Sequence, residues 1–357
     1  MGLTVIYAVL IFSFLIFVHE LGHFIAAKLV GIKVNEFSLG MGPLFLSIAG
    51  GKVSCLPGLT KSKAHLGGKS TKDNTKYSLR VLPIGGFVKM EGEDEDSNDP
   101  RAFNKKNPFQ RALVLIAGSF MNLLTTVVLI AVMALSIGMA STVIDQVSEN
   151  YPAEAAGIIA GDRIVRINGQ HIGDWSDVTG ILGSTHGDSV IISVKRGNEE
   201  LDFVSGIAVN EDGRKVIGIT SRIEHSPGRS LKAGVTGTWD WTKEMFNYLK
   251  LLFIGQGSMD DLVGPVGIVS IINDQAKMGF FYIINLAALI SLNLAIVNML
   301  PLPALDGGRL LFLVVRQVTG RRITDSLEEK IHFAGLMLLF ALMVYLVIHD
   351  VDRFILN

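Results

Sequence analysis

The sequence predicts an α-helical membrane protein with four transmembrane helices and an inserted extracytoplasmic α/β domain. Composition is the first indication: 49% of the 357 residues are hydrophobic and only 18% are charged, whereas about a quarter are charged in soluble domains. The second indication is that the apolar residues form long runs. A net charge of −1 provides no basic field, so we expect membrane lipid and no nucleic acid as partners. The single cysteine, Cys55, excludes an intramolecular disulfide and a multi-cysteine metal cluster.

Four apolar segments are candidates for transmembrane helices, because about 20 apolar residues cross a bilayer. The first combines Leu3–Val18 with Phe24–Val30 and must therefore include the polar residues between them. A secretory signal peptide is the competing interpretation, but no Lys or Arg precedes Lys28, so we predict an uncleaved helix. The other candidates are Ala112–Met139, Phe280–Leu300 and Phe333–Ile348.

Basic residues near the predicted helices indicate their orientation, since Lys and Arg are enriched at cytoplasmic ends. They follow the first helix, precede the second and lie between the third and fourth: Lys28, Lys33, Lys105, Lys106, Arg111, Arg316, Arg321, Arg322 and Lys330. We therefore expect these segments in the cytoplasm, with residues 141–279 and both termini outside.

Residues 141–222 have the pattern of a compact α/β domain. Val190–Val194 is typical of a strand, and Asn168-Gly169 and Asp212-Gly213 are turn signals. The run Ser148–Gly157, followed by Gly161–Gly169, resembles a PDZ domain of the bacterial protease type. PDZ domains bind extended peptides by strand addition, and a spacer domain without a ligand is the alternative.

The first predicted helix carries the sequence His19-Glu20-Leu21-Gly22-His23, which matches H-E-x-x-H. Residues i and i+4 share one face of a helix, so His19 and His23 can bind one zinc ion, and Glu20 can accept a proton from zinc-bound water. Ionisable side chains are costly inside an apolar helix and need a functional reason there. The motif therefore predicts a zinc site with Glu20 as the catalytic base.

A catalytic zinc ion needs three protein ligands and an open position. No third histidine follows closely, so the candidates are Glu36, just beyond the first helix, and Asp306. Pro301 and Pro303 must break the third helix ahead of Asp306. Broken backbone at membrane depth is tolerated only where it is buried in protein or lines a wet cavity. Asp306 is the better candidate, although the Asp-Gly-Gly sequence would equally suit a turn or a helix N-cap.

Four motifs together resemble the site-2 protease family of intramembrane zinc metalloproteases. They are HELGH at 19–23, NMLPLPALDGG at 298–308, GSFMN at 118–122 and GPVGI at 264–268. The PDZ-like domain and YSLRVLPIGGFVKMEGE at 77–93 are similar to the bacterial RseP type. The matching motifs extend over nearly the whole chain.

This resemblance implies zinc held by His19, His23 and Asp306, with Glu20 as base. It also implies a membrane re-entrant β-region whose edge pairs with substrate, and a cleft lined by asparagines. The implied substrate-binding residues are Asn293, Asn298, Leu82, Ile84, Gly85 and Gly86. The implied substrates are single-span membrane proteins, such as trimmed anti-sigma factors or signal-peptide remnants, at a bacterial inner membrane. The PDZ domain would then be extracytoplasmic, with the active site toward the cytoplasm.

Two departures from the family pattern are a single PDZ unit, where some members have two, and a long excursion at 50–73. The chain then divides as follows: 1–33, first helix with the zinc motif; 34–108, cytoplasmic-side loop and re-entrant β-region; 109–140, second helix; 141–222, PDZ domain; 223–279, outer amphipathic linker; 280–315, third helix and the broken-helix ligand; 316–357, fourth helix and C-terminus. In the linker, Trp239, Trp241, Phe246 and Tyr248 indicate an amphipathic segment at the outer interface.

Two other functions compete with proteolysis. A non-catalytic membrane adaptor, with the PDZ domain as its working part, would not need Asp306. A transporter would explain the broken helix and polar residues at the membrane midplane, but no inverted repeat is visible. The remaining histidines have no partner at ligand spacing and are predicted to be surface or interface residues: His65, His171, His186, His225, His332 and His349. The sequence does not indicate an oligomeric state.

Overall fold

The computed structural model describes residues 2–50, 52–55, 75–93, 95–257, 263–320 and 325–353. Most of the predicted excursion at 50–73, with His65, lies outside the described residues. The chain forms two compact units, one made of Met1–Ile130 with Gly234–Asn357 and the other of Ala131–Ala233. The first unit contains the predicted membrane helices, apart from the last residues of the second one, and the second unit contains the inserted α/β domain.

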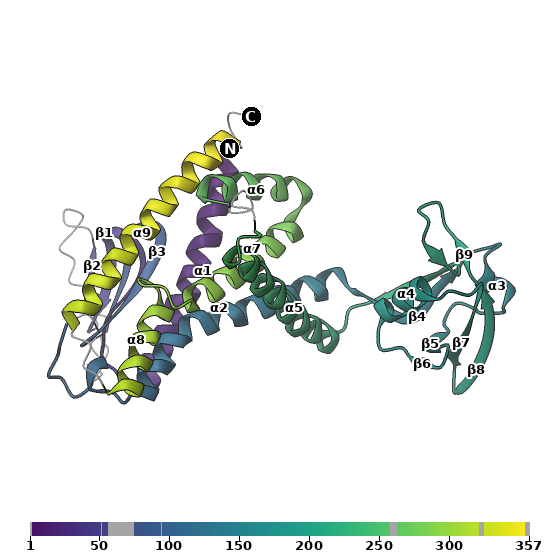
Figure 1. The fold of residues 1–357 in the computed structure, drawn as a ribbon, viewed down its shortest axis with the longest axis horizontal. Helices are drawn as coiled ribbons and strands as arrows, with labels where there is room; N and C mark the ends of the chain where they lie inside the picture. Colours follow the sequence, from purple (N-terminus) through teal and green to yellow (C-terminus); the bar gives the residue numbers. More distant parts are fainter. Residues whose placement is uncertain are drawn as a thin grey trace. The chain divides into compact units, whose positions relative to one another are not determined.

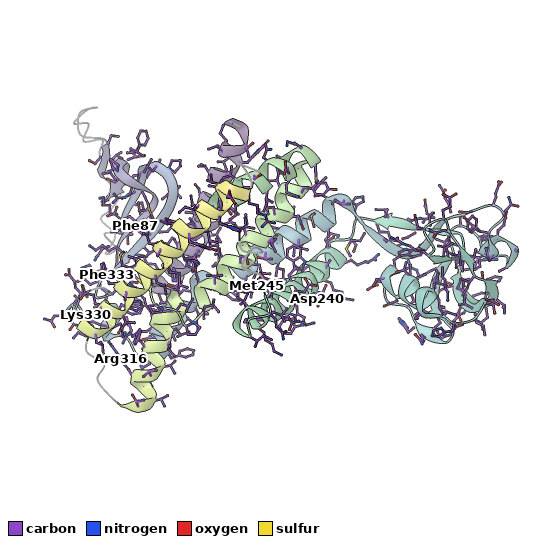
Figure 2. All side chains as sticks on the ribbon, turned by 45° about the horizontal axis from the view of Figure 1, so that its top comes forward. Phe87, Asp240, Met245, Arg316, Lys330 and Phe333 are labelled. Atoms are coloured by element: carbon purple, nitrogen blue, oxygen red, sulfur yellow. The ribbon has the colours of Figure 1, made fainter. Side chains whose placement is uncertain are left out.

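Four helices in the described part of the chain are long and apolar enough to cross a membrane, as predicted. They are α1 (Gly2–Leu29), α2 (Pro108–Ile137), α7 (Phe280–Met299) and α9 (Asp325–Val351) (Figure 1). Helix α9 begins well before the predicted Phe333. Phe333 is 62% exposed and projects from the helix (Figure 2). An apolar helix that buries so little of its surface in protein is suited to contact with lipid.

A small sheet follows α1, in the order β2-β1-β3. Its strands are β1 (Val34–Ala49), β2 (Lys52–Cys55) and β3 (Lys76–Met90), and they lie within residues 34–108, where a β-region is expected. Because β1 and β3 are long and irregular, Glu36 pairs with both Lys89 and Lys76. Residues 86–90 of β3 pair with β1, and no other described strand pairs with them. This half of β3 is therefore an edge strand.

Aromatic residues attach the small sheet to α1. The ring of Phe37 on β1 stacks on Phe24 with centroids 4.9 Å apart, and Phe17 approaches Phe37 at 5.8 Å. Such ring pairs contribute beyond the apolar area that they bury. They hold the edge half of β3 beside the helix that carries the histidine motif.

The second unit is built on a sheet in the order β11-β4-β5-β7-β8, with β6 paired to β5. Its core is made of buried aliphatic side chains, among them Ile144, Ile167 and Ile192. The buried Asp162 carboxylate accepts two hydrogen bonds at 2.8 Å from the guanidinium of Arg196. The bounds are β4 (Met139–Val147), α3 (Pro152–Ala155), β5 (Arg163–Ile167), β6 (Gln170–His171), α4 (Trp175–Ser184), β7 (Ser189–Arg196), β8 (Glu199–Gly206), β9 (Ala208–Val209), β10 (Lys215–Val216) and β11 (Ile219–Glu224). This sheet with two short helices matches the predicted α/β domain.

The described part of the predicted outer linker, which leaves out 258–262, contains the helices α5 (Pro227–Phe253) and α6 (Pro265–Met278). Helix α5 is amphipathic, but its apolar face is the exposed one. Trp239 and Phe246 are exposed, whereas Thr238 is buried. This distribution is typical of a helix at a membrane surface, and the location of Trp239 at the outer interface stays a prediction.

A buried carboxylate from α9 caps the N-terminus of α6. The backbone amides of Gly264 and Gly267 donate to Asp350 at 3.1 and 2.8 Å, and Asp350 is only 1% exposed. A β-carbon at Gly264 would lie 2.7 Å from Asp350 Oδ2, so only glycine fits. Side-chain caps satisfy backbone amides that have no partner within their own helix, and here the cap also fastens α6 to α9.

We expect Asp350→Ala to destabilise the protein, because two buried amides lose their acceptor. A loss of about 1–3 kcal/mol in the free energy of unfolding is typical of unsatisfied buried groups. Thermal unfolding of the purified protein in detergent measures this loss. The control is Asp274→Ala, which removes an exposed ion pair to Lys277 on α6 and a 3.5 Å hydrogen bond from Asn273, and should change little. Equal unfolding midpoints for the two variants would contradict the capping role.

Candidate metal centre

Helix α1 presents both histidines of the motif on one buried face. His19 and His23 are each 8% exposed, and their rings meet edge to face with centroids 4.8 Å apart. Asp306 opens helix α8 (Asp306–Thr319) and brings its carboxylate to the same point. Among the described residues, these three form the group of side chains that could hold a metal ion.

The three donor atoms form a nearly equilateral triangle. Asp306 Oδ2 lies 3.1 Å from His19 Nε2 and 3.3 Å from His23 Nε2, and the two Nε2 atoms are 3.2 Å apart. Zinc bonds of about 2.0–2.1 Å in a tetrahedron put neighbouring donors roughly 3.3 Å apart. The triangle therefore fits zinc, and its donor types are those that zinc prefers.

The backbone ahead of Asp306 is folded tightly, which explains the sequence around it. Helix α7 ends at Met299, and Ala304 adopts a left-handed conformation with φ of 71°. β-carbons at Gly307 and Gly308 would lie 2.3 Å from Leu300 O and 2.2 Å from Leu302 O. The Asp-Gly-Gly sequence is thus required where α8 packs against the end of α7.

Two alternatives were left open by the sequence: Asp306 as a helix N-cap, and Glu36 as the third metal ligand. Leu305, not Asp306, is the N-cap of α8, so the N-cap alternative for Asp306 was wrong. Glu36 accepts hydrogen bonds from Ser78 Oγ at 2.6 Å and Arg80 at 2.9 Å within the small sheet. It is not in the group of side chains that could hold a metal ion, so the geometry favours Asp306 over Glu36.

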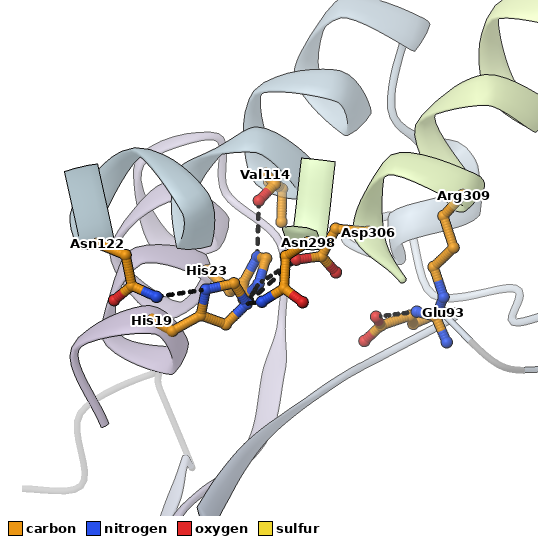
Figure 3. A network of polar contacts seen from close by, with 8 residues as sticks. All are labelled: His19, His23, Glu93, Val114, Asn122, Asn298, Asp306 and Arg309. Atoms are coloured by element: carbon orange, nitrogen blue, oxygen red, sulfur yellow. Dashed lines mark hydrogen bonds and ion pairs between the residues drawn. The ribbon is translucent and has the colours of Figure 1, made fainter. Parts of the chain in front are cut away.

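Helix α2 completes the site, because it contacts both histidine rings. The Nδ1–H of His23 donates to Val114 O at 2.8 Å, and the side-chain amide of Asn122 lies 3.4 Å from His19 Nδ1 (Figure 3). A β-carbon at Gly118, between them, would lie 2.3 Å from His23 Nε2. The signal available in the sequence was a glycine and an asparagine four residues apart in an apolar helix.

Glu20 lies between two cavities. One, of about 240 Å³, is lined by His19, Glu20, Asn298 and Asp306 among others. The other, of about 390 Å³, is also lined by His19, Glu20 and Asp306, and in addition by His23 and residues 87–90 of β3. The backbone of Val88 hydrogen-bonds to Glu20. The carboxylate therefore has room beside it for a water molecule.

The predicted substrate-binding residues lie at different distances from this centre. Asn298 is close, with its amide nitrogen 3.5 Å from His19 Nε2. A β-carbon at Gly86 would lie 3.6 Å from Glu20 Cγ. Three others are not among the residues lining the two cavities and have no described contact with the triad: Leu82, Gly85 and Asn293. The side chain of Ile84 lies outside the described part of the structure.

None of the other described histidines belongs to the metal-binding group. His225 Nδ1 is 2.7 Å from Leu135 O, and His332 Nδ1 accepts from the Ala304 amide at 2.8 Å. These contacts agree with the prediction that the remaining histidines are surface or interface residues. His332 additionally supports the turn that leads to Asp306.

Comparison with known proteins decides the family. A model of peptidase family M50 matches residues 7–62 and 58–342. The chain belongs to peptidase family M50. This confirms the resemblance to site-2 proteases and the prediction of an intramembrane metallopeptidase.

Several curated relatives match this M50 peptidase over nearly their whole length. One is a Clostridium perfringens protein whose name describes it, by inference, as a zinc metalloprotease. It is 36% identical to this chain, over 97% of this chain and 98% of the relative. The regulator of sigma-W protease RasP of Bacillus subtilis is 29% identical over 98% of both chains. A solved PDZ domain of an SdrC-like protein from Listeria innocua matches 25% of this chain and 97% of its own, at 30% identity and a TM-score of 0.22. The relatives from Clostridium perfringens and Geobacillus kaustophilus are both named as zinc metalloproteases, which supports the predicted Zn²⁺ cofactor.

We expect Gly118→Ala to abolish zinc binding, because the added methyl group would occupy the space of the His23 imidazole. Zinc per purified protein, measured by atomic absorption, should fall close to zero. Gly237→Ala is the matched control, since its methyl group would make only ordinary contacts at 3.7 Å with Ile130. Wild-type zinc content in Gly118→Ala would show that the histidines do not sit against α2 as described.

Proposed function

We propose that His19, His23 and Asp306 hold the catalytic zinc ion and that Glu20 is the general base of an intramembrane endopeptidase. The observation that carries this proposal is the triangle of three donor atoms with sides of 3.1–3.3 Å, formed by segments almost 290 residues apart. Zinc, when bound, supplies Lewis-acid polarisation of the scissile carbonyl and makes water more acidic.

Glu20 performs the proton transfers. Its carboxylate accepts a proton from the attacking water and delivers it to the nitrogen of the leaving amine. The adjoining cavities support this role, because both are lined by Glu20 and Asp306. The side-chain amide of Asn298, beside His19, is a suitable donor to a substrate carbonyl oxygen.

The edge strand of β3 is the proposed docking site for substrate. A transmembrane helix keeps its peptide bonds internally hydrogen-bonded, so it must unwind before a protease can act. An unwound segment can pair with a free strand edge by strand addition. Residues 86–90 have such an edge, and Val88 contacts Glu20. We extend this docking site along β3 through Leu82, Ile84 and Gly85, which a re-entrant β-region would carry into the membrane.

The proposed substrates are single-span membrane proteins that another protease has trimmed, such as anti-sigma factors, or signal-peptide remnants. The name of the Bacillus subtilis relative, a regulator of sigma-W protease, supports this class. The distribution of basic residues supports a cytoplasmic side for Lys28 and Lys33 and an extracytoplasmic PDZ domain. In that position the PDZ domain would exclude bulky ectodomains or engage the new C-terminus of a trimmed substrate.

We expect Glu20→Gln to lower turnover by about 10²–10⁴-fold, because the amide cannot accept the proton of water. Zinc content should stay at the wild-type level, since Glu20 is not a proposed ligand. Cleavage of a single-span reporter reconstituted in liposomes, together with metal analysis, measures both quantities. Glu244→Gln, an exposed change on α5, is the control for loss of charge. Wild-type cleavage by Glu20→Gln would contradict the assignment of Glu20 as the general base.

A further inference from the structure

Both zinc-facing imidazoles are supported from behind by α2. Residues 114, 118 and 122 lie one turn apart on one face of this helix. Val114 contacts His23 through its backbone carbonyl, Gly118 leaves space for both rings, and Asn122 contacts His19 through its side chain. The two histidines therefore have unequal supports: one uses a backbone atom, and the other depends on a particular side chain.

The orientation of the Asn122 amide leaves one polar atom without a partner. Asn122 is completely buried, and its side-chain nitrogen is the atom 3.4 Å from His19 Nδ1. Its Oδ1 has no hydrogen-bond partner among the described residues. Buried polar atoms without partners are rare and costly. Since the oxygen and nitrogen of an amide have nearly the same shape, a half-turn of the group exchanges them without disturbing the packing.

The chemistry of the metal ligand selects between the two orientations. Binding a metal through Nε2 requires the lone pair of that nitrogen, so the proton of neutral His19 must be on Nδ1. An Nδ1–H facing the amide nitrogen of Asn122 would put two donors together. An Nδ1–H facing Oδ1 forms a hydrogen bond and satisfies the orphaned oxygen. Metal binding and the burial of Asn122 thus require the same orientation.

We propose that Asn122 is a positioning residue whose side-chain oxygen accepts the Nδ1 proton of His19, fixing the imidazole in the tautomer and orientation that bind zinc. This inference rests on the proposed zinc site. The backbone carbonyl of Asn122 is separately occupied, because it accepts hydrogen bonds from Ser291 Oγ at 2.8 Å and Thr126 Oγ1 at 3.0 Å. Neither bond involves the side-chain amide of Asn122.

The test compares zinc affinities of full-length protein in detergent, by competition with a chromophoric chelator. Asn122→Leu keeps the size of the side chain but removes the acceptor, and the affinity should fall by about 10–100-fold. Asn122→Asp keeps an acceptor and cannot donate through a carboxylate, so it should retain zinc within a few-fold of wild type. Ser291→Ala removes a neighbouring bond to the same residue's carbonyl and should leave zinc affinity unchanged.

The outcomes separate this proposal from the zinc site itself. Wild-type affinity in Asn122→Leu, with zinc lost in His19→Ala, would overturn the positioning role and leave the ligand assignment intact. Equal losses in Asn122→Leu and Asn122→Asp would show that Asn122 contributes through packing or as a donor, and would also overturn it. Absence of zinc binding by the wild type, or its retention in His19→Ala, would overturn both proposals.

Discussion

The close approach of α1 to α2 is the contact on which the rest of the site depends. A β-carbon at Gly22, inside the histidine motif, would lie 2.3 Å from Ala117 O, and one at Gly118 would meet His23. Each glycine therefore lets the partner helix approach, in the way that small residues bring membrane helices together. The histidine rings then lie against α2 on one side and face Asp306 on the other.

This arrangement explains how a polar centre is tolerated within apolar helices. Pairing buried polar groups with one another lowers the cost of burying them. Val114 and Asn122 support the imidazoles, and Asp306 provides the negative charge that a divalent cation requires. The turn before α8, held by Gly307 and Gly308, delivers that charge without placing an acidic residue in the middle of a membrane helix.

The sequence predicted what side-chain types and spacing encode. The histidine pair, the glutamate beside it, the break at Pro301 and the carboxylate of Asp306 were each visible as polar exceptions in apolar segments. The role of Val114 was not visible, because a backbone carbonyl leaves no chemical signature, and the motif at 118–122 did not indicate which side chains Gly118 makes room for. Both roles emerge only when the packing of α1 against α2 is known.

The same limit applies to the fold. The long membrane helices followed from their apolar runs, and a β-region between the first two of them followed from the family resemblance. The pairing of Glu36 with two different segments of β3 depends on irregular register, which no local pattern specifies. The capping of α6 by Asp350 joins residues 83–86 positions apart, whereas sequence rules for helix caps consider only neighbouring residues.

The most direct measurement of the metal centre is zinc K-edge X-ray absorption of the purified full-length protein. The structure predicts a four-coordinate zinc ion with two imidazole ligands and oxygen ligands at about 2.0–2.1 Å. One of these oxygen ligands should disappear from the wild-type coordination in Asp306→Ala. A spectrum with a third imidazole or a sulfur ligand, or one left unchanged by Asp306→Ala, would contradict a centre built from His19, His23 and Asp306.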